Sequence, residues 1–332
     1  MNNKINTQKY QSIYEKEIVK LNKRFNRLFI NKEPKSLYEP SSYIVKSGGK
    51  RLRPFLVLAS AKAVGAKFSD VYNAAMAVEL LHNFTLVHDD IMDNAEKRRG
   101  KPTIHKIYDE STAILTGDNL TAYSYKSLLK DCKNNSVEVV NTFTQGIIEV
   151  CEGQSFDELF EIKNNVSISD YKKMIFKKTA SLSGMCCSIG AQLGGGSKEE
   201  VRSLFGYGKN LGMAFQIKDD FLDIFGDEKK FGKLVGGDLL EGKKTYLLLR
   251  ALEKAKGKNK TSLQSVIKNN GISKSQIQYY KNIYLELGVD IDAKKEIKNY
   301  TKRALQSLKI LKDKESIELL TWLANSLIGR NN

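Results

Sequence analysis

The chain has 332 residues, with 54 Lys or Arg against 38 Asp or Glu, and a net charge of +16. This length suits one large helical domain or two ordinary ones, and no apolar run approaches the ~20 residues of a membrane span. The basic residues are scattered without a nucleic-acid-binding motif, and the polar N-terminus resembles neither a secretory signal nor a transit peptide. We therefore expect a cytoplasmic protein with no nucleic-acid partner.

The cysteines indicate neither a disulfide framework nor a zinc site. Cys132, Cys151, Cys186 and Cys187 show no paired CxxC spacing and no nearby histidine pattern. The adjacent Cys186 and Cys187 lie in a stretch of small residues, so we expect them to be buried thiols.

Helical periodicity recurs along the chain. All four prolines lie at or before Pro102, and apolar residues then follow helical spacing up to a final amphipathic helix over 317–328. Strictly alternating runs are scarce, so we expect an all-α fold without a sheet, organised as one domain over 1–332. The predicted helix connections are 48–49, 100–102, 163–165, 194–196, 226–237 and 256–260.

An aspartate-rich motif, DDxxD, occurs twice in apolar helical surroundings. The first copy contains Asp89, Asp90 and Asp93, and the second contains Asp219, Asp220 and Asp223. On a helix each copy crowds three carboxylates onto one turn, where like charges repel. A lone copy would be read as a solvated acidic turn. Two copies in matching contexts favour a Mg²⁺ site, because this ion prefers oxygen ligands and keeps positions open for phosphate.

Glycine-spaced basic residues accompany these acids, as diphosphate binding would require. Two glycines precede Lys50, Arg51 and Arg53, and Arg98 and Arg99 follow the first acid motif. After the second motif come Lys233, Lys243 and Lys244, again between glycines. The segment around Lys50 could be a solvated loop, and Arg98 and Arg99 could form surface salt bridges with the nearby aspartates. The repeated order of acids and glycine-spaced cations favours anion binding.

Four further polar residues have two open interpretations. His82 lies two helical turns before Asp89, on the same face, and could contact phosphate or pack in the core. Lys178 and Thr179 could bind substrate or form a solvated helix end. Gln216, three residues before Asp219, could face the reacting carbons or join a buried polar network.

Together these segments resemble the trans-isoprenyl diphosphate synthases, also called polyprenyl synthetases. The segments GGKRLRP, HNFTLVHDDIMD, RRGKPT, KTA, GMAFQIKDD and GKLVGGDLLEGKKT appear in the family's order. The resemblance implies the all-α isoprenoid synthase fold around a deep central cavity and a homodimer. It also implies Mg²⁺ as cofactor, with three ions per site, and isopentenyl and C5–C15 allylic diphosphates as substrates.

The resemblance also implies roles for individual residues. Lys50, Arg53, His82 and Arg99 match residues that bind isopentenyl diphosphate. Arg98, Lys178, Lys233 and Lys243 match residues that bind the allylic diphosphate, with Thr179 and Gln216 near its reacting carbons. Asp89, Asp93 and Asp219 match the main metal ligands, supported by Asp90, Asp220 and Asp223.

Two residues before the first acid motif bear on product length. Phe84 and Thr85 lie roughly 6–8 Å along the helix from Asp89, where a growing chain could run. In the family, an aromatic residue five positions before the motif shortens products. The second aromatic and the two-residue insertion of C15-forming types are absent. The pattern resembles archaeal-type geranylgeranyl diphosphate synthases, which make a C20 product, although Phe84 could equally be ordinary core.

Several alternatives remain open. A farnesyl (C15) or longer-chain synthase would share these motifs, whereas a terpene cyclase would not need the basic segment at residues 48–54. A non-catalytic partner subunit of a heteromeric synthase would typically have lost one of the motifs. The basic surface would also permit peripheral contact with an anionic membrane.

Overall fold

The computed structural model describes residues 6–227 and 235–329, which are almost entirely helical. This confirms the predicted all-α class. Within these ranges, no helix combines the length and apolar composition needed to cross a bilayer. Cys186 and Cys187 are fully buried, as expected.

The chain divides into two compact units that alternate along the sequence. Unit 1 comprises Met1–Thr144, Cys186–Phe205 and Ile310–Trp322, and unit 2 comprises Gln145–Met185, Gly206–Lys309 and Leu323–Asn332. Among the described residues, four α-helices contain residues of both units: α7 (Ser136–Ile162), α9 (Ser181–Leu193), α10 (Lys198–Phe225) and α17 (Lys314–Ile328). The expectation of a single domain over 1–332 stays a prediction.

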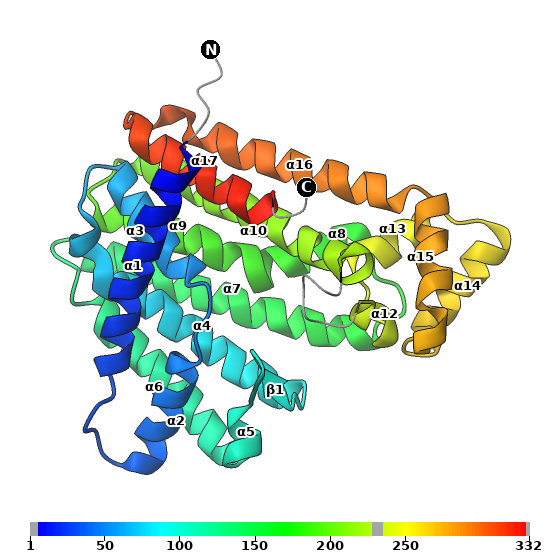
Figure 1. Ribbon diagram of the computed structural model, residues 1–332, viewed down its shortest axis with the longest axis horizontal. Coiled ribbons are helices and arrows are strands. Elements are labelled where there is room, and N and C mark those ends of the chain that lie inside the picture. Colours follow the sequence, from blue (N-terminus) through cyan, green and yellow to red (C-terminus); the bar gives the residue numbers. More distant parts are fainter. Residues whose placement is uncertain (1–5, 228–234, 330–332) are drawn as a thin grey trace. The chain divides into compact units, whose positions relative to one another are not determined.

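Unit 1 is built around helix α4, which carries the first acid motif at its end. Helix α4 spans Tyr72–Met92, and the other elements of the unit are α1 (Thr7–Arg27), α2 (Lys35–Lys46), α3 (Leu52–Ala63), η1 (Phe68–Val71), β1 (Lys97–Arg98), β2 (Lys101–Pro102), α5 (Ile104–Ile107) and α6 (Glu110–Leu128). Helix α4 packs against α3 and α6, which lie beside it in Figure 1. Apolar residues occur on most of its faces, which suits a helix buried by its neighbours.

The strands β1 and β2 form a minimal hairpin after the first acid motif, although no sheet was expected. Lys97 pairs with Pro102 and Arg98 with Lys101. Arg99 and Gly100 between them both have positive φ angles, 54° and 75°. This is the backbone pattern of the tight turns that join short antiparallel strands. Two-residue strands are too short to show an alternating sequence pattern.

Unit 2 carries the second acid motif on α10. Its other elements are α8 (Ile168–Ile175), η2 (Phe176–Ala180), α12 (Gly237–Leu240), α13 (Tyr246–Lys254), α14 (Gly257–Lys268), η3 (Lys274–Gln276), α15 (Ile277–Glu286), α16 (Val289–Ser307) and η4 (Leu308–Ile310), the last residue of which belongs to unit 1. Its core includes Met213, Ile217 and Ile224 of α10, packed with Leu247 of α13 and Tyr284 of α15. The core thus holds the helix from which Asp219, Asp220 and Asp223 project.

Most of the predicted connections that the structure describes in full lie between helices, with one exception, and residues 228–234 of the break predicted at 226–237 lie outside the described residues. Residues 163–165 separate α7 from α8, and residues 194–196 separate α9 from α10. The break predicted at 256–260 is wrong for most of its length, because α14 begins at Gly257 and includes the following Lys-Asn-Lys. Charged residues suit an exposed first turn as well as a loop. The last helix begins at Lys314, three residues before the predicted start.

Candidate active site

The first acid motif divides its carboxylates between the interior and the surface. Asp90 is 2% exposed, and its Oδ1 accepts a hydrogen bond from Arg98 Nε at 2.6 Å. Burial raises the pKa of Asp90, and the Arg98 guanidinium opposes that shift. Asp93 is exposed where α4 ends, and half-buried Asp89 lies one turn before it. Arg98, predicted to bind the allylic diphosphate, is thus paired with an acid predicted to bind metal.

The second acid motif shows the same division. Asp219 is exposed, whereas Asp220 is 5% exposed and accepts hydrogen bonds from Tyr171 Oη at 2.5 Å and Gln216 Nε2 at 3.1 Å. Burial raises the pKa of Asp220 to about 6 despite these donors. Half-buried Asp223 accepts a hydrogen bond from the backbone N–H of Asp238 at 3.0 Å.

In both motifs the middle aspartate lies inside its unit, while the first and third stay at least partly accessible. The first and third are i, i+4 neighbours, so each motif offers two carboxylates on one side of a helix turn. Among the described residues, no three acidic, histidine or cysteine side chains gather closely enough to hold an ion by themselves. Mg²⁺ fits such a donor set, because it typically binds one or two carboxylates together with waters and substrate phosphates.

Arg53 and His82 form a pair with two unused donors. Arg53 Nη1 lies 3.1 Å from His82 Nε2, and because arginine only donates, Nε2 accepts. The proton of the neutral ring is then on Nδ1. His82 Nδ1 and Arg53 Nε are both buried with no hydrogen-bond partner among the described residues. Each of these buried, unpartnered donors is a candidate to bind an anionic oxygen.

The electrostatic surroundings keep His82 neutral. Burial is the main cause that lowers its pKa well below 6.5, and Arg53, Arg99, Arg98 and Arg51 lower it further. Arg99 Nη1 donates a hydrogen bond to the Gly48 carbonyl, at the start of the glycine-rich loop. Arg53 and Arg99 thus both lie close enough to His82 to affect its pKa, and Lys50 is exposed on the same loop.

The segment with Lys178 and Thr179 is a short π-helix, η2, between α8 and α9. Such bulges often occur at functional sites. Lys178 Nζ pairs with Asp157 Oδ2 of α7 at 2.6 Å, and Thr179 Oγ1 donates to Gln216 Oε1 at 3.1 Å. Through Gln216 the chain of hydrogen bonds continues to Asp220. Thr179, Gln216 and the second acid motif therefore form one network within unit 2.

The segment after the second motif is only partly described. Lys233, predicted to bind the allylic diphosphate, lies outside the described residues. Lys243 is 2.7 Å from Glu241, and both side chains are largely exposed. Asp238 lies close to Asp220 and Asp223, and burial, with these acids, raises its pKa to about 8.

The two residues predicted to set product length lie on α4 before Asp89. The Phe84 ring meets the His88 imidazole edge-on, with centroids 4.7 Å apart. Thr85 Oγ1 donates to the His82 carbonyl at 2.8 Å, so its hydroxyl is satisfied within the helix. Phe84 is half-buried, which leaves part of its ring accessible.

Sequence reasoning missed Asp157, Tyr171 and Asp238. Asp238 lies in the segment GGDLL, 15 residues after Asp223. Its position soon after the second acid motif is the one sequence signal that could have marked it as a site residue. No sequence pattern distinguishes Asp157 or Tyr171 from the many charged and aromatic residues on helices. Their partners, Lys178 and Asp220, lie 21 and 49 positions away.

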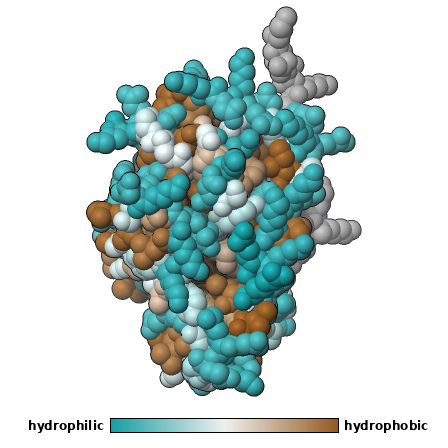
Figure 2. Space-filling model, turned by 90° about the vertical axis from the view of Figure 1, so that its left-hand side faces the viewer, coloured by the Kyte–Doolittle hydropathy of each residue, from teal (hydrophilic) through white to brown (hydrophobic). Residues whose placement is uncertain are grey.

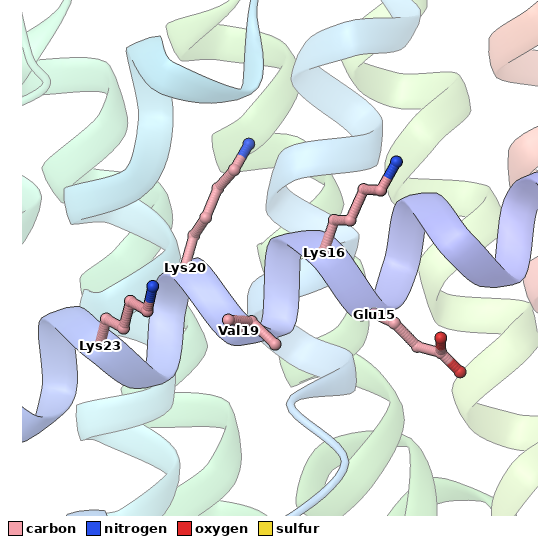
Figure 3. A pocket seen from close by; sticks show the side chains of 5 residues that line it. All are labelled: Glu15, Lys16, Val19, Lys20 and Lys23. Atoms are coloured by element: carbon pink, nitrogen blue, oxygen red, sulfur yellow. The ribbon is translucent and has the colours of Figure 1, made fainter.

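A shallow hollow on the outside of α1 lies apart from these residues in the sequence. It is lined by Glu15, Lys16, Val19, Lys20 and Lys23, which all come from that one helix (Figure 3). It contains no residue predicted for the active site.

Comparison with known proteins places these motifs in a family. The model of the polyprenyl synthetase family matches residues 34–284. The geranylgeranyl diphosphate synthase of Sulfolobus acidocaldarius is 37% identical over 97% of this chain and 99% of that protein. A geranylfarnesyl diphosphate synthase of Natronomonas pharaonis is 34% identical over 90% of this chain and 91% of that protein.

The solved structures agree with this assignment. The geranylgeranyl pyrophosphate synthetase of Pyrococcus horikoshii superposes with a TM-score of 0.91 at 36% identity, over 97% of this chain and 100% of that one. This confirms the predicted isoprenoid synthase fold. From its fold, its paired acid motifs and its sequence, the chain belongs to the polyprenyl synthetase family.

Proposed function

We propose that this protein is a Mg²⁺-dependent prenyltransferase that condenses isopentenyl diphosphate head to tail with allylic diphosphates to give geranylgeranyl diphosphate. In this reaction the C1–O bond of the allylic substrate breaks, and diphosphate leaves with the electron pair. The isopentenyl double bond attacks the allylic cation and forms the new C–C bond. Loss of a proton from the isopentenyl unit, with diphosphate as base, completes the product.

The chain's own residues would bind, orient and shield the two substrates. Arg53 Nε and His82 Nδ1, with Lys50 and Arg99, would bind the isopentenyl diphosphate. Arg98, Lys178, Lys233 and Lys243 would bind the allylic diphosphate, near Thr179 and Gln216.

Asp89, Asp93 and Asp219 would hold three Mg²⁺ ions, with support from Asp90, Asp220 and Asp223. When bound, these ions supply Lewis-acid stabilisation of the charge that develops on the departing diphosphate.

One observation carries the proposal: the same chain has buried, unpartnered N–H donors on Arg53 and His82 as well as two carboxylate pairs. An enzyme that joins two diphosphates needs both features. The purified protein should convert isopentenyl diphosphate and a C5, C10 or C15 allylic diphosphate into longer products when Mg²⁺ is present. No product from any primer would contradict the proposal.

The competing functions predict different outcomes in the same assay. A terpene cyclase would consume an allylic diphosphate without isopentenyl diphosphate. A non-catalytic partner subunit would be inactive when purified alone. The intact acid motifs favour a catalytic protein over a non-catalytic partner subunit. The unpartnered donors on Arg53 and His82 favour a synthase that binds a second diphosphate over a terpene cyclase.

Product length is the finer part of the proposal. The single aromatic residue Phe84, followed by Thr85, favours a C20 product over C15, and the relatives named as geranylgeranyl diphosphate synthases support it. Farnesyl or longer-chain products remain the alternatives. Chromatography of products labelled from isopentenyl diphosphate separates the three lengths.

A homodimer is also proposed. Several large apolar residues of unit 1 are exposed on α5 and α6 or beside them: Ile107, Tyr108, Ile114 and Leu115. Hydrophobic areas lie between hydrophilic ones on the face drawn in Figure 2. A second copy would bury such residues, so Leu115→Glu should weaken the dimer in light-scattering measurements. An unchanged dimer would place the interface elsewhere.

The basic side of α1 supports peripheral contact with an anionic membrane. Lys16, Lys20, Lys23 and Arg27 follow helical spacing there, and Val19 is 53% exposed beside them (Figure 3). Such a stripe attracts anionic headgroups, and the proposed product is itself amphipathic. Co-sedimentation with phosphatidylserine vesicles, but not with neutral ones, would support this contact. A cytoplasmic location fits the same proposal and stays a prediction.

A further inference from the structure

Arg51 lies between two residues of the proposed isopentenyl diphosphate site, yet it faces the interior. It is 3% exposed, and each donor nitrogen has a protein acceptor. Its Nε donates to Asn22 Oδ1 at 3.1 Å, Nη1 to Glu79 Oε1 at 2.6 Å, and Nη2 to the Val45 carbonyl at 2.6 Å. These partners lie on α1, α4 and α2, so Arg51 ties three helices to the start of α3, and each of its nitrogens is already engaged within the protein.

Two features of Arg51 each carry a free-energy cost, so stability of the fold does not explain them. Both members of its ion pair with Glu79 are almost fully buried, with side chains 2% and 3% exposed. Burying such a pair requires desolvation that its attraction often fails to repay. Arg51 also has a left-handed backbone, with φ 49° and ψ 36°, which is uncommon for a residue other than glycine. Such conformations cluster at functional sites.

The position of this ion pair relates it to the proposed substrate site. Glu79 and His82 are three residues apart on α4 and therefore share a face. Arg51 and Arg53 are two residues apart at the start of α3. The same two segments are thus linked twice, by Arg51–Glu79 and by Arg53–His82. The buried first link fixes how the second is placed.

We propose that Arg51 is a positioning residue, which through Glu79 holds Arg53 and His82 so that their unpartnered N–H groups meet the diphosphate of isopentenyl diphosphate. Arg51 itself does not contact the substrate. This inference rests on the proposed function and deepens it, because it assigns Arg51 the role of positioning the subsite. Arg53 and His82 are the residues that bind the diphosphate there.

Three variants test the proposal by steady-state kinetics with each substrate varied in turn. Arg51→Lys keeps the charge but has only one nitrogen for three acceptors, and Glu79→Gln keeps the shape but leaves Arg51 unpaired. The double variant Arg51→Met/Glu79→Met removes both charges, a change that cores often tolerate. Arg250→Met is the matched control, since it breaks a half-exposed ion pair with Asp292 in unit 2.

We expect the KM for isopentenyl diphosphate to rise roughly 10- to 100-fold in all three variants, because small misplacements of binding groups have effects of this size. The KM for the allylic diphosphate should stay unchanged, and calorimetry should show the same loss of isopentenyl diphosphate binding. The double variant should melt close to the wild-type temperature and still show the raised KM. The control should leave both KM values unchanged.

The proposal is overturned if folded variants, checked by circular dichroism, keep the wild-type KM for isopentenyl diphosphate. It is also overturned if both KM values rise together, since that would mean general loosening of the fold. The proposed function fails separately, if the wild-type protein neither binds nor consumes isopentenyl diphosphate.

Discussion

At the Arg53–His82 pair, the fixed chemistry of arginine determines which nitrogen of the histidine carries the proton. Because Nε2 accepts from Arg53, the free donor is Nδ1–H, and it is buried without a partner. The neutral imidazole can donate this Nδ1–H hydrogen bond at any pH above its lowered pKa. The positive charge of this pair then comes from Arg53.

Substituting His82 tests this assignment. Gln can retain an acceptor near Arg53 but has no group at the Nδ1 position, so His82→Gln should raise the KM for isopentenyl diphosphate roughly tenfold. Asn places an amide N–H near the Nδ1 position, so His82→Asn should raise it less. If both variants have equal KM values, Nδ1–H is not the binding group.

The lowered pKa of His82 also predicts a pH dependence of stability. Above pH 6.5 the ring is neutral in both the folded and unfolded chains, so it adds no pH dependence. As the pH falls below 6.5, the unfolded chain binds a proton that the buried ring does not, and the free energy of unfolding decreases. His82→Gln should therefore lose less stability than wild type between about pH 7.5 and about pH 5.5 in thermal denaturation. Equal losses would contradict a neutral, buried His82.

Phe84 tests the proposal on product length. Its ring is braced by His88, so removing it should open space for a longer chain. Phe84→Ala should shift the products beyond C20 in radiochromatography. Phe68→Ala, which removes another half-buried aromatic ring of unit 1, should leave product length unchanged. An unchanged C20 profile in Phe84→Ala would mean that Phe84 does not limit the chain.

For single residues, the sequence predicts which side chains belong to the site better than it predicts how those side chains are oriented. The motifs identify both aspartate triplets, and helical spacing explains why the first and third aspartates share a side. That Asp90 and Asp220 turn inward depends on Arg98 and Tyr171, which come from other segments of the chain. The inward role of Arg51 is equally hidden, because GGKRLRP presents Arg51 and Arg53 as equivalent cations.

At the scale of elements, the π-helix η2 shows how packing positions a functional segment. A side chain at Gly153 of α7 would approach the backbone nitrogen of Lys178 to 2.1 Å, so only glycine permits this contact. Gly153 thus allows α7 to lie directly against the segment that carries Lys178 and Thr179. Periodicity cannot predict such a bulge, because one inserted residue barely changes the apolar pattern.

Replacing this glycine should disturb the site more than the fold. Gly153→Ala forces η2 away from α7, and overpacking of this kind typically costs about 1–3 kcal/mol. We expect a large loss of kcat, with a smaller change in melting temperature. Gly206→Ala is the matched control, because its added methyl group would meet the Ser307 hydroxyl at 3.0 Å and no backbone atom. Full activity in Gly153→Ala would contradict this account of η2.

For the whole molecule, some features of the fold can be predicted from the sequence and others are known only from the structure. The all-α class and most helix connections follow from periodicity and glycine positions, whereas the hairpin and the start of α14 do not. The division into two interleaved units could not be predicted, because it depends on contacts between distant segments and leaves no shift in composition. The two acid motifs belong to different units, Asp89 to unit 1 and Asp219 to unit 2.

The central claim is that both motifs are needed for Mg²⁺-dependent binding of the allylic diphosphate. Calorimetry with farnesyl thiodiphosphate, a slowly reacting analogue, measures this binding directly in wild type, Asp89→Asn and Asp219→Asn. We predict tight binding by wild type that is abolished by a chelator, and weakened binding in each variant, with Mg²⁺ no longer restoring it. Binding that is unaffected by the chelator, or variants that retain full Mg²⁺-dependent affinity, would contradict the claim.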